Sequence, residues 1–301
     1  MKNYCLPALM MLFLLSCKRD KDTTDSDPMI DPIPQFAVSE TTFQPSSKFL
    51  KREISYTKGN PLLKQVRLFT YDNTNRCTEI RVGIIDSAQS NPAFQVSRTL
   101  TFSYTGASLL PASVNLVRSV FPNLVTTFYY NYNSQGRKIR DSVRVKNQAG
   151  EPADMVIHYQ YEKDQVFATP VLRGFPMENN NLDTLSLLKG GNIEKLVSKT
   201  IKASGDRMTT YTFTYDQFIS PYRKMNIANS LYFEHPSIGI GYNVPKETHY
   251  MGVTINNMTS WTSGNYTATF KYQYNVDKYP LRKELYLPGD TEPYQVTLFE
   301  Y

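Results

Sequence analysis

One short pattern recurs along most of this 301-residue chain. It consists of an alternating aromatic segment ending in tyrosine, then a polar turn, then a segment rich in Lys, Arg and β-branched residues. The copies lie at residues 68–71, 101–104, 128–132, 157–161, 211–215 and 270–274. The final tyrosines are spaced 33, 28, 29, 54 and 59 residues apart. We therefore expect a repeat architecture, with one degenerate unit in each of the two long gaps.

The residue types of one unit predict a β-hairpin. Period-two alternation places Phe69 and Tyr71 on one face of a strand and Thr70 on the other. Asp72 and Asn73 are turn formers, so the basic segment that follows can pair back on the first strand. The 22 Tyr and 16 Phe suit such half-buried strands. Helical windows are scarce, and the best candidate, residues 179–188, could equally be loop.

A single hairpin is marginally stable, so consecutive hairpins are expected to pair edge to edge. Open edges aggregate, and the sheet must therefore curl or have blunted edges. The predicted fold is all-β, with antiparallel hairpin repeats forming one large curved sheet or barrel-like wrap in a soluble domain.

The first residues are typical of a secretory signal. Lys2 precedes an apolar stretch at 6–16 that is too short to cross a bilayer as a helix. The stretch ends in Leu14-Leu15-Ser16-Cys17, which resembles a bacterial lipobox. The resemblance implies cleavage before Cys17, a thioether to diacylglycerol on its sulfur, and acylation of the new amino terminus. An ordinary secretory signal that happens to contain a cysteine is the alternative.

This reading divides the chain into a signal peptide at 1–16, a lipidated Cys17 with a flexible, proline-containing tether at 17–47, and a repeat-built β domain at 48–301. Position 18 is Lys rather than Asp. By resemblance to lipoprotein sorting rules, this implies a lipid anchor in the outer membrane. Two orientations are left open, with the domain on the periplasmic side or on the cell surface. Cys77 lies in a strand-like segment and is interpreted as a small core residue.

The repeats are similar to the tyrosine–aspartate repeats of Rhs-type shell proteins. The whole arrangement more closely resembles an uncharacterised family of bacterial lipoproteins with a proposed porin-like β fold. The copy at 132–137 keeps the Gly-Arg of tidy Tyr-Asp-x-x-Gly-Arg repeats, and the other copies depart from it. The resemblance implies no activity. Charges such as Arg140, Arg144 and Lys271 recur in the middle of predicted strands, which argues against a membrane-spanning barrel.

Site motifs are scarce. His158, His235 and His249 lack metal-ligand spacing, and a nucleophile elbow, a P-loop and a dinucleotide fingerprint are missing from the sequence. We expect no catalytic residue, metal or cofactor. Trp261 with Asn265 and Tyr266 could form a stacking platform for sugar rings. A Trp that caps the core at a hairpin end is the simpler interpretation.

Three functional hypotheses remain. In the first, a non-enzymatic lipoprotein binds a ligand or an envelope partner on its Tyr-rich sheet, with a glycan as one candidate. In the second, the sheet is only a structural scaffold of the envelope. In the third, a hydrolase uses dispersed carboxylates such as Asp141, Glu151 and Asp154. Nucleic acid is not expected as a partner, since Lys and Arg alternate with Asp and Glu.

The lipobox predicts that Cys17 carries the lipid. Cells expressing the wild-type chain should incorporate radiolabelled palmitate into it, and Cys17→Ala should abolish the label because alanine has no thiol to modify. Cys77→Ala serves as a control and should leave labelling unchanged. Equal labelling of wild type and Cys17→Ala would remove the lipoprotein hypothesis.

Overall fold

The structure is a computed structural model that describes residues 49–134, 138–146, 153–162, 165–172, 181–187, 192–200, 205–222 and 256–301. The regular structure in these residues is β throughout, as the sequence predicts. None of them belongs to a helix long and apolar enough to cross a membrane. The strands are β1 (Arg52–Thr57), β2 (Asn60–Tyr71), β3 (Cys77–Asp86), β4 (Phe94–Tyr104), β5 (Pro111–Arg118), β6 (Phe121–Tyr132), β7 (Lys138–Lys146), β8 (Ala153–Glu162), β9 (Gln165–Leu172), β10 (Asn181–Leu187), β11 (Ile193–Thr200), β12 (Arg207–Ile219), β13 (Asn256–Ser263), β14 (Tyr266–Tyr274), β15 (Pro280–Tyr286) and β16 (Gln295–Glu300).

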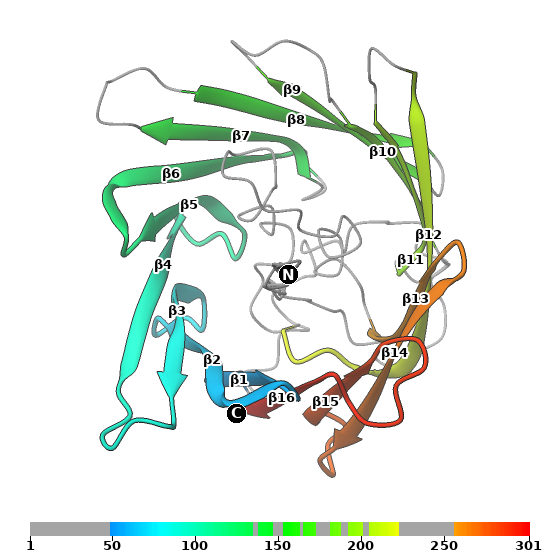
Figure 1. Cartoon of the computed structure of the whole chain (residues 1–301). Coiled ribbons are helices and arrows are strands. Elements are labelled where there is room, and N and C mark those ends of the chain that lie inside the picture. The colour runs from blue at the N-terminus through cyan, green and yellow to red at the C-terminus, as the bar shows by residue number, and fades with distance from the viewer. Residues whose placement is uncertain are drawn as a thin grey trace, which may run out of the picture.

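These strands form one antiparallel sheet that closes on itself. Each strand pairs with its neighbours in the chain, and β1 pairs with β16 from Arg52 opposite Glu300 to Thr57 opposite Gln295. Figure 1 shows the resulting ring, with blue β1 beside red β16. The Arg52 guanidinium adds a two-pronged ion pair to Glu300, through Nε at 2.7 Å and Nη2 at 2.6 Å. Closure leaves no free sheet edge among the described strands.

The predicted hairpins are present, and the two long gaps differ from each other. In the first gap, β9 and β10 supply a hairpin whose second strand does not end in tyrosine. In the second gap, β12 pairs directly with β13, Phe213 lying opposite Trp261. No further strand lies between β12 and β13 in the described sheet, and the degenerate unit expected in this gap falls on residues 223–255, which lie outside the described residues. The helical candidate is wrong, because residues 181–187 form β10.

Tyrosines at or just after the ends of four even-numbered strands, β2, β4, β6 and β16, fasten each of these strands to the start of the strand before it. The tyrosine hydroxyl donates a hydrogen bond to a backbone carbonyl at or just before the start of that strand. The bonds are Tyr71 to Leu50 (2.8 Å), Tyr104 to Cys77 (2.7 Å), Tyr132 to Pro111 (3.0 Å) and Tyr301 to Pro280 (3.0 Å). We call this end of the barrel the tyrosine rim and the other end the opposite rim.

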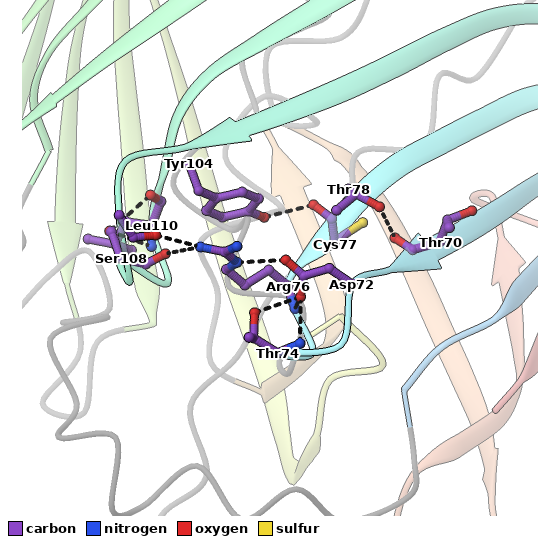
Figure 2. Close-up of polar contacts among 10 residues, drawn as sticks. Thr70, Asp72, Thr74, Arg76, Cys77, Thr78, Tyr104, Ser108 and Leu110 are labelled. Carbon is purple, nitrogen blue, oxygen red and sulfur yellow. Dashed lines mark hydrogen bonds and ion pairs between the residues drawn. The ribbon is translucent and has the colours of Figure 1, made fainter.

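Asp72 explains why an acidic or amide residue follows the tyrosine (Figure 2). Its Oδ1 accepts hydrogen bonds from the backbone N–H groups of Thr74 (2.9 Å) and Arg76 (3.0 Å), which closes the turn. Burial opposes ionisation, yet the bonds from Thr74 and Arg76 lower the pKa of Asp72 from 3.8 to about 2. Arg76 also donates to the Gly106 carbonyl at 2.9 Å and lies 4.8 Å from the centre of the Tyr104 ring, so neighbouring hairpins are tied together.

The same turn recurs after Tyr274. Asn275 Oδ1 accepts from the backbone N–H groups of Asp277 (3.0 Å) and Tyr279 (2.9 Å), as Asp72 does in its own turn. Asn75 and Lys278, which both stand three residues after the turn-closing side chain, have φ angles of 65° and 66°. Left-handed backbone favours glycine. The Gly of tidy Tyr-Asp-x-x-Gly-Arg repeats occupies this position.

The two faces of the barrel differ in polarity. On β14, Ala268 and Phe270 are buried, whereas Thr267, Thr269 and Lys271 are exposed. Tyr222, which follows β12, contacts β1 and β16 from across the ring, so the buried face is the inner one. The core on this face includes Ile80, Leu100, Val114, Leu116, Phe128, Ile157, Leu196, Phe213, Leu285 and Phe299.

The outer face is mostly polar. Charged side chains stand exposed in the middle of several strands, namely Arg81, Arg140, Arg144, Lys195 and Lys271. Threonines pair across strands, as Thr262 does with Thr267 at 3.0 Å between their hydroxyl oxygens. On this side of the sheet, β1, β2 and β16 carry four apolar side chains, Ile54, Val66, Val296 and Leu298, of which Val66 and Val296 are buried.

The tyrosine bonds predict a measurable loss of stability in Tyr104→Phe. The variant keeps the ring over Arg76 but leaves the Cys77 carbonyl without this donor, so the free energy of unfolding should fall by about 1 kcal/mol. Urea unfolding would measure it. Tyr129→Phe is the matched control, because Tyr129 is 44% exposed on the outer face, and a change within about 0.5 kcal/mol is expected. Equal effects in the two variants would contradict the proposed role of the hydroxyl.

Candidate aromatic binding site and wall cluster

The hairpin of β13 and β14 carries the predicted platform. A two-residue turn, Gly264-Asn265, joins the strands at the opposite rim, and Gly264 supplies the positive φ of 57° that such a tight turn requires. Trp261 lies three residues before this turn and Tyr266 directly follows it. Alternation points both side chains to the inner face, since Trp261 pairs with buried Ala268, two residues from Tyr266.

Three aromatic rings meet at this point. Trp261 and Tyr266 stack with ring centroids 5.1 Å apart and planes 23° apart. Tyr211 of β12 meets Trp261 edge-on at 6.4 Å and 64°. Tyr266 is 40% exposed, whereas Tyr211 and Trp261 are half-buried. We call these three residues the aromatic mouth.

The structure thus brings two of the three predicted platform residues together. Asn265 is exposed in the adjoining turn, beside the stacked pair in sequence. Trp261 lies in strand β13 and not in a loop, and it packs against the core, which agrees with the simpler interpretation of a core cap. Cys17 lies outside the described residues.

Sequence reasoning missed Tyr211. The signal was present, because Tyr211, Phe213 and Tyr215 alternate along one strand and so share a face. The sequence does not show which strand lies beside β12. The chain from 223 to 255 intervenes before β13, and only the pairing of Thr212 with Thr262 brings Tyr211 beside Trp261.

A second polar group lies on the inner wall, where β1, β2, β15 and β16 meet. We call Glu53, Arg67, Tyr222 and Lys283 the wall cluster. Glu53 and Arg67 are opposite one another on β1 and β2 and form a buried ion pair at 3.3 Å. Both are almost fully buried, so each charge depends on the other. The Tyr222 hydroxyl donates to the second carboxylate oxygen of Glu53.

Lys283 is the titratable amine of the wall cluster. Its ammonium lies 5.9 Å from the centres of both the Phe270 and Phe299 rings. Loss of hydration lowers the pKa of Lys283 from 10.5 to about 8, and the positive charge of Arg67 adds to this, while Glu53 opposes it. Burial likewise raises the pKa of Tyr222 well above its ordinary value, with the charge of Glu53 acting in the same direction.

The other chemical candidates are dispersed. Asp141 is buried on the inner face and accepts a hydrogen bond from the Tyr159 hydroxyl at 2.7 Å. Glu151 lies outside the described residues, as do His235 and His249. His158 is exposed on the outer face of β8. Within the part of the chain that the structure describes, no three His, Cys, Asp or Glu side chains gather as a metal site would require. Cys77 is fully buried at the start of β3.

Comparison with known proteins yields structural similarity alone. No family model matches the chain, and no curated protein matches it. A porin-like protein from Bacteroides vulgatus is 13% identical, with a TM-score of 0.49, covering 84% of this chain and 98% of that one. A porin-like protein from Bacteroides uniformis is 14% identical, with a TM-score of 0.47, covering 85% and 98%. These likenesses say nothing about ligand or activity.

A third solved structure, the TcdB2-TccC3-Cdc42 complex, is 10% identical with a TM-score of 0.22. The match covers 82% of this chain and 16% of that one.

The lowered pKa of Lys283 predicts how stability depends on pH. Between about pH 8 and 10.5 the unfolded chain binds more protons at this lysine than the folded chain, so the free energy of unfolding should rise with pH. The rise can reach about 1.4 kcal/mol per pH unit. Urea unfolding at pH 7.5, 8.5 and 9.5 would measure it.

Lys283→Met should flatten this rise between pH 7.5 and 9.5, because methionine has no proton to release. Lys271→Met removes an exposed ammonium from the outer face and should leave the slope as in the wild type. A wild-type slope that survives in Lys283→Met would show that another group is responsible.

Proposed function

We propose that this protein is a non-enzymatic, lipid-anchored component of the outer membrane. Its barrel does not span the bilayer, and its aromatic mouth binds a ligand of the glycan class. The main support for glycan binding is the stack of Trp261 on Tyr266, which presents a partly exposed aromatic pair at the opposite rim of the barrel. The lipobox at Cys17 supports the anchor.

The distribution of charge supports a barrel outside the bilayer. A spanning barrel needs an apolar outer band, and Arg or Lys near the bilayer midplane costs about 2–4 kcal/mol. Here the outer face carries exposed mid-strand charges such as Arg81 on β3, Arg140 on β7 and Lys271 on β14. The apolar side chains point mainly to the inner face, so hydrophobic burial is achieved within the barrel.

The topology supports a mouth that faces away from the anchor. Leu50 enters β1 at the tyrosine rim, where its carbonyl accepts the Tyr71 hydroxyl. A tether at 17–47 would therefore join the barrel at that rim. The aromatic mouth lies at the opposite rim, because β13 runs away from the tyrosine rim before it turns at Gly264-Asn265. A ligand would then meet the mouth without competition from the membrane surface.

Flat aromatic rings suit sugars, because the apolar C–H face of a pyranose can lie on a ring while its hydroxyls stay hydrated. A stacked pair uses one face of each ring. The exposed amide of Asn265 can donate and accept hydrogen bonds beside it. A purely structural role in the envelope predicts no such binding. A binding experiment therefore distinguishes the scaffold from the glycan-binding protein.

The test is titration of the purified full-length chain with a panel of envelope and plant oligosaccharides. The single Trp of the sequence, Trp261, is in the mouth, so its fluorescence reports binding directly. Tyr266→Ala keeps this reporter and should weaken binding at least tenfold, equivalent to about 1.4 kcal/mol. Tyr129→Ala removes an exposed aromatic from the outer face and should bind as the wild type does. A correctly folded chain that binds nothing in the panel would favour the scaffold.

A further inference from the structure

A row of arginines crosses the inner face of β2 to β5. The register places Arg67 opposite Val82, Val82 opposite Arg98, and Arg98 opposite Arg118. Buried Val82 belongs to the core, so the row lies on the inner face. Arg67 is already paired with Glu53. Arg98 and Arg118 continue the row toward the opposite rim.

Arg98 and Arg118 face each other directly across two neighbouring strands. Residues in such positions have Cβ atoms about 4.5–5.5 Å apart, and like charges there repel. Within the described part of the chain, the Arg118 guanidinium makes no hydrogen bond or ion pair, and the side chain is half-buried. The guanidinium of Arg118 presents planar donors that fit a carboxylate, sulfate or phosphate, and Arg98 places a second arginine opposite it on the neighbouring strand.

The arginine pair and the aromatic mouth share one rim of the barrel. Arg118 is the last residue of β5 and Tyr266 the first of β14, and both adjoin turns of the opposite rim. In Figure 1, β4 and β5 lie on the left of the ring while β13 and β14 lie on the right. The same opening thus presents rings on one side and positive charge on the other.

We propose that Arg98 and Arg118 form an anion subsite, and that the ligand of the aromatic mouth is an acidic oligosaccharide. This inference rests on the proposed glycan binding. One sugar of the chain stacks on Trp261 and Tyr266, and an anionic group farther along the chain binds the guanidinium pair. The ligand must be long enough to reach both sides of the opening, so short acidic sugars bind at one side only.

The experiment compares an oligogalacturonate with its methyl ester, which keeps the sugar rings and removes the charge. The wild-type full-length chain should bind the acid at least tenfold more tightly than the ester in 50 mM salt, and the difference should shrink in 500 mM salt. Arg118→Gln should abolish the preference while leaving affinity for the ester unchanged. Arg140→Gln, which removes an exposed arginine from the outer face, should keep the preference.

Folding is checked by thermal melting. Arg118→Gln should melt close to the wild-type temperature, because the half-buried Arg118 guanidinium makes no hydrogen bond or ion pair within the described residues. Equal affinity for acid and ester in the wild type, or a preference that survives Arg118→Gln, would overturn the anion subsite and leave the glycan function standing. If the chain bound neither the acid nor the ester, and also bound none of the oligosaccharides in the panel above, both the anion subsite and the glycan function would be contradicted.

Discussion

The pairing of β1 with β16 is the contact on which the rest of the structure depends. It joins Arg52 to Glu300, at the two ends of the described chain, through six pairs of residues and a two-pronged ion pair. Without it the hairpins would form an open sheet with two exposed edges, which invites pairing with other chains. With it the sheet has an inside and an outside, and both the core and the mouth are defined by that distinction.

Closure is reinforced locally by the tyrosine rim. A hydroxyl at the end of one strand bonds the carbonyl at the start of the strand before it, and an Asp or Asn turn holds the following residues in place. Because several units use the same bonds, much of the barrel is built by repetition, and each strand pairs with its two neighbours. A chain of such units can vary greatly in sequence while it keeps tyrosine and the turn former.

The inner face holds two kinds of chemistry at different depths. The wall cluster of Glu53, Arg67, Tyr222 and Lys283 lies within the barrel, where Tyr222 ties the segment after β12 to β1. The aromatic mouth and the arginine pair lie toward the opposite rim. Buried charges need partners, and this explains why the deeper group is internally bonded whereas Arg118, near the rim, is half-buried and open to an anion.

The sequence alone determined the strand character, the hairpin period and the Tyr-Asp turn, because alternation and turn chemistry act over a few residues. It also marked Trp261 and Tyr266, which are neighbours across one hairpin. Closure through β1 and β16, the adjacency of Tyr211 to Trp261, and the alignment of Arg98 with Arg118 were decided by tertiary structure. Each depends on which strands lie side by side and in which register, and a one-residue slip would turn every side chain to the other face.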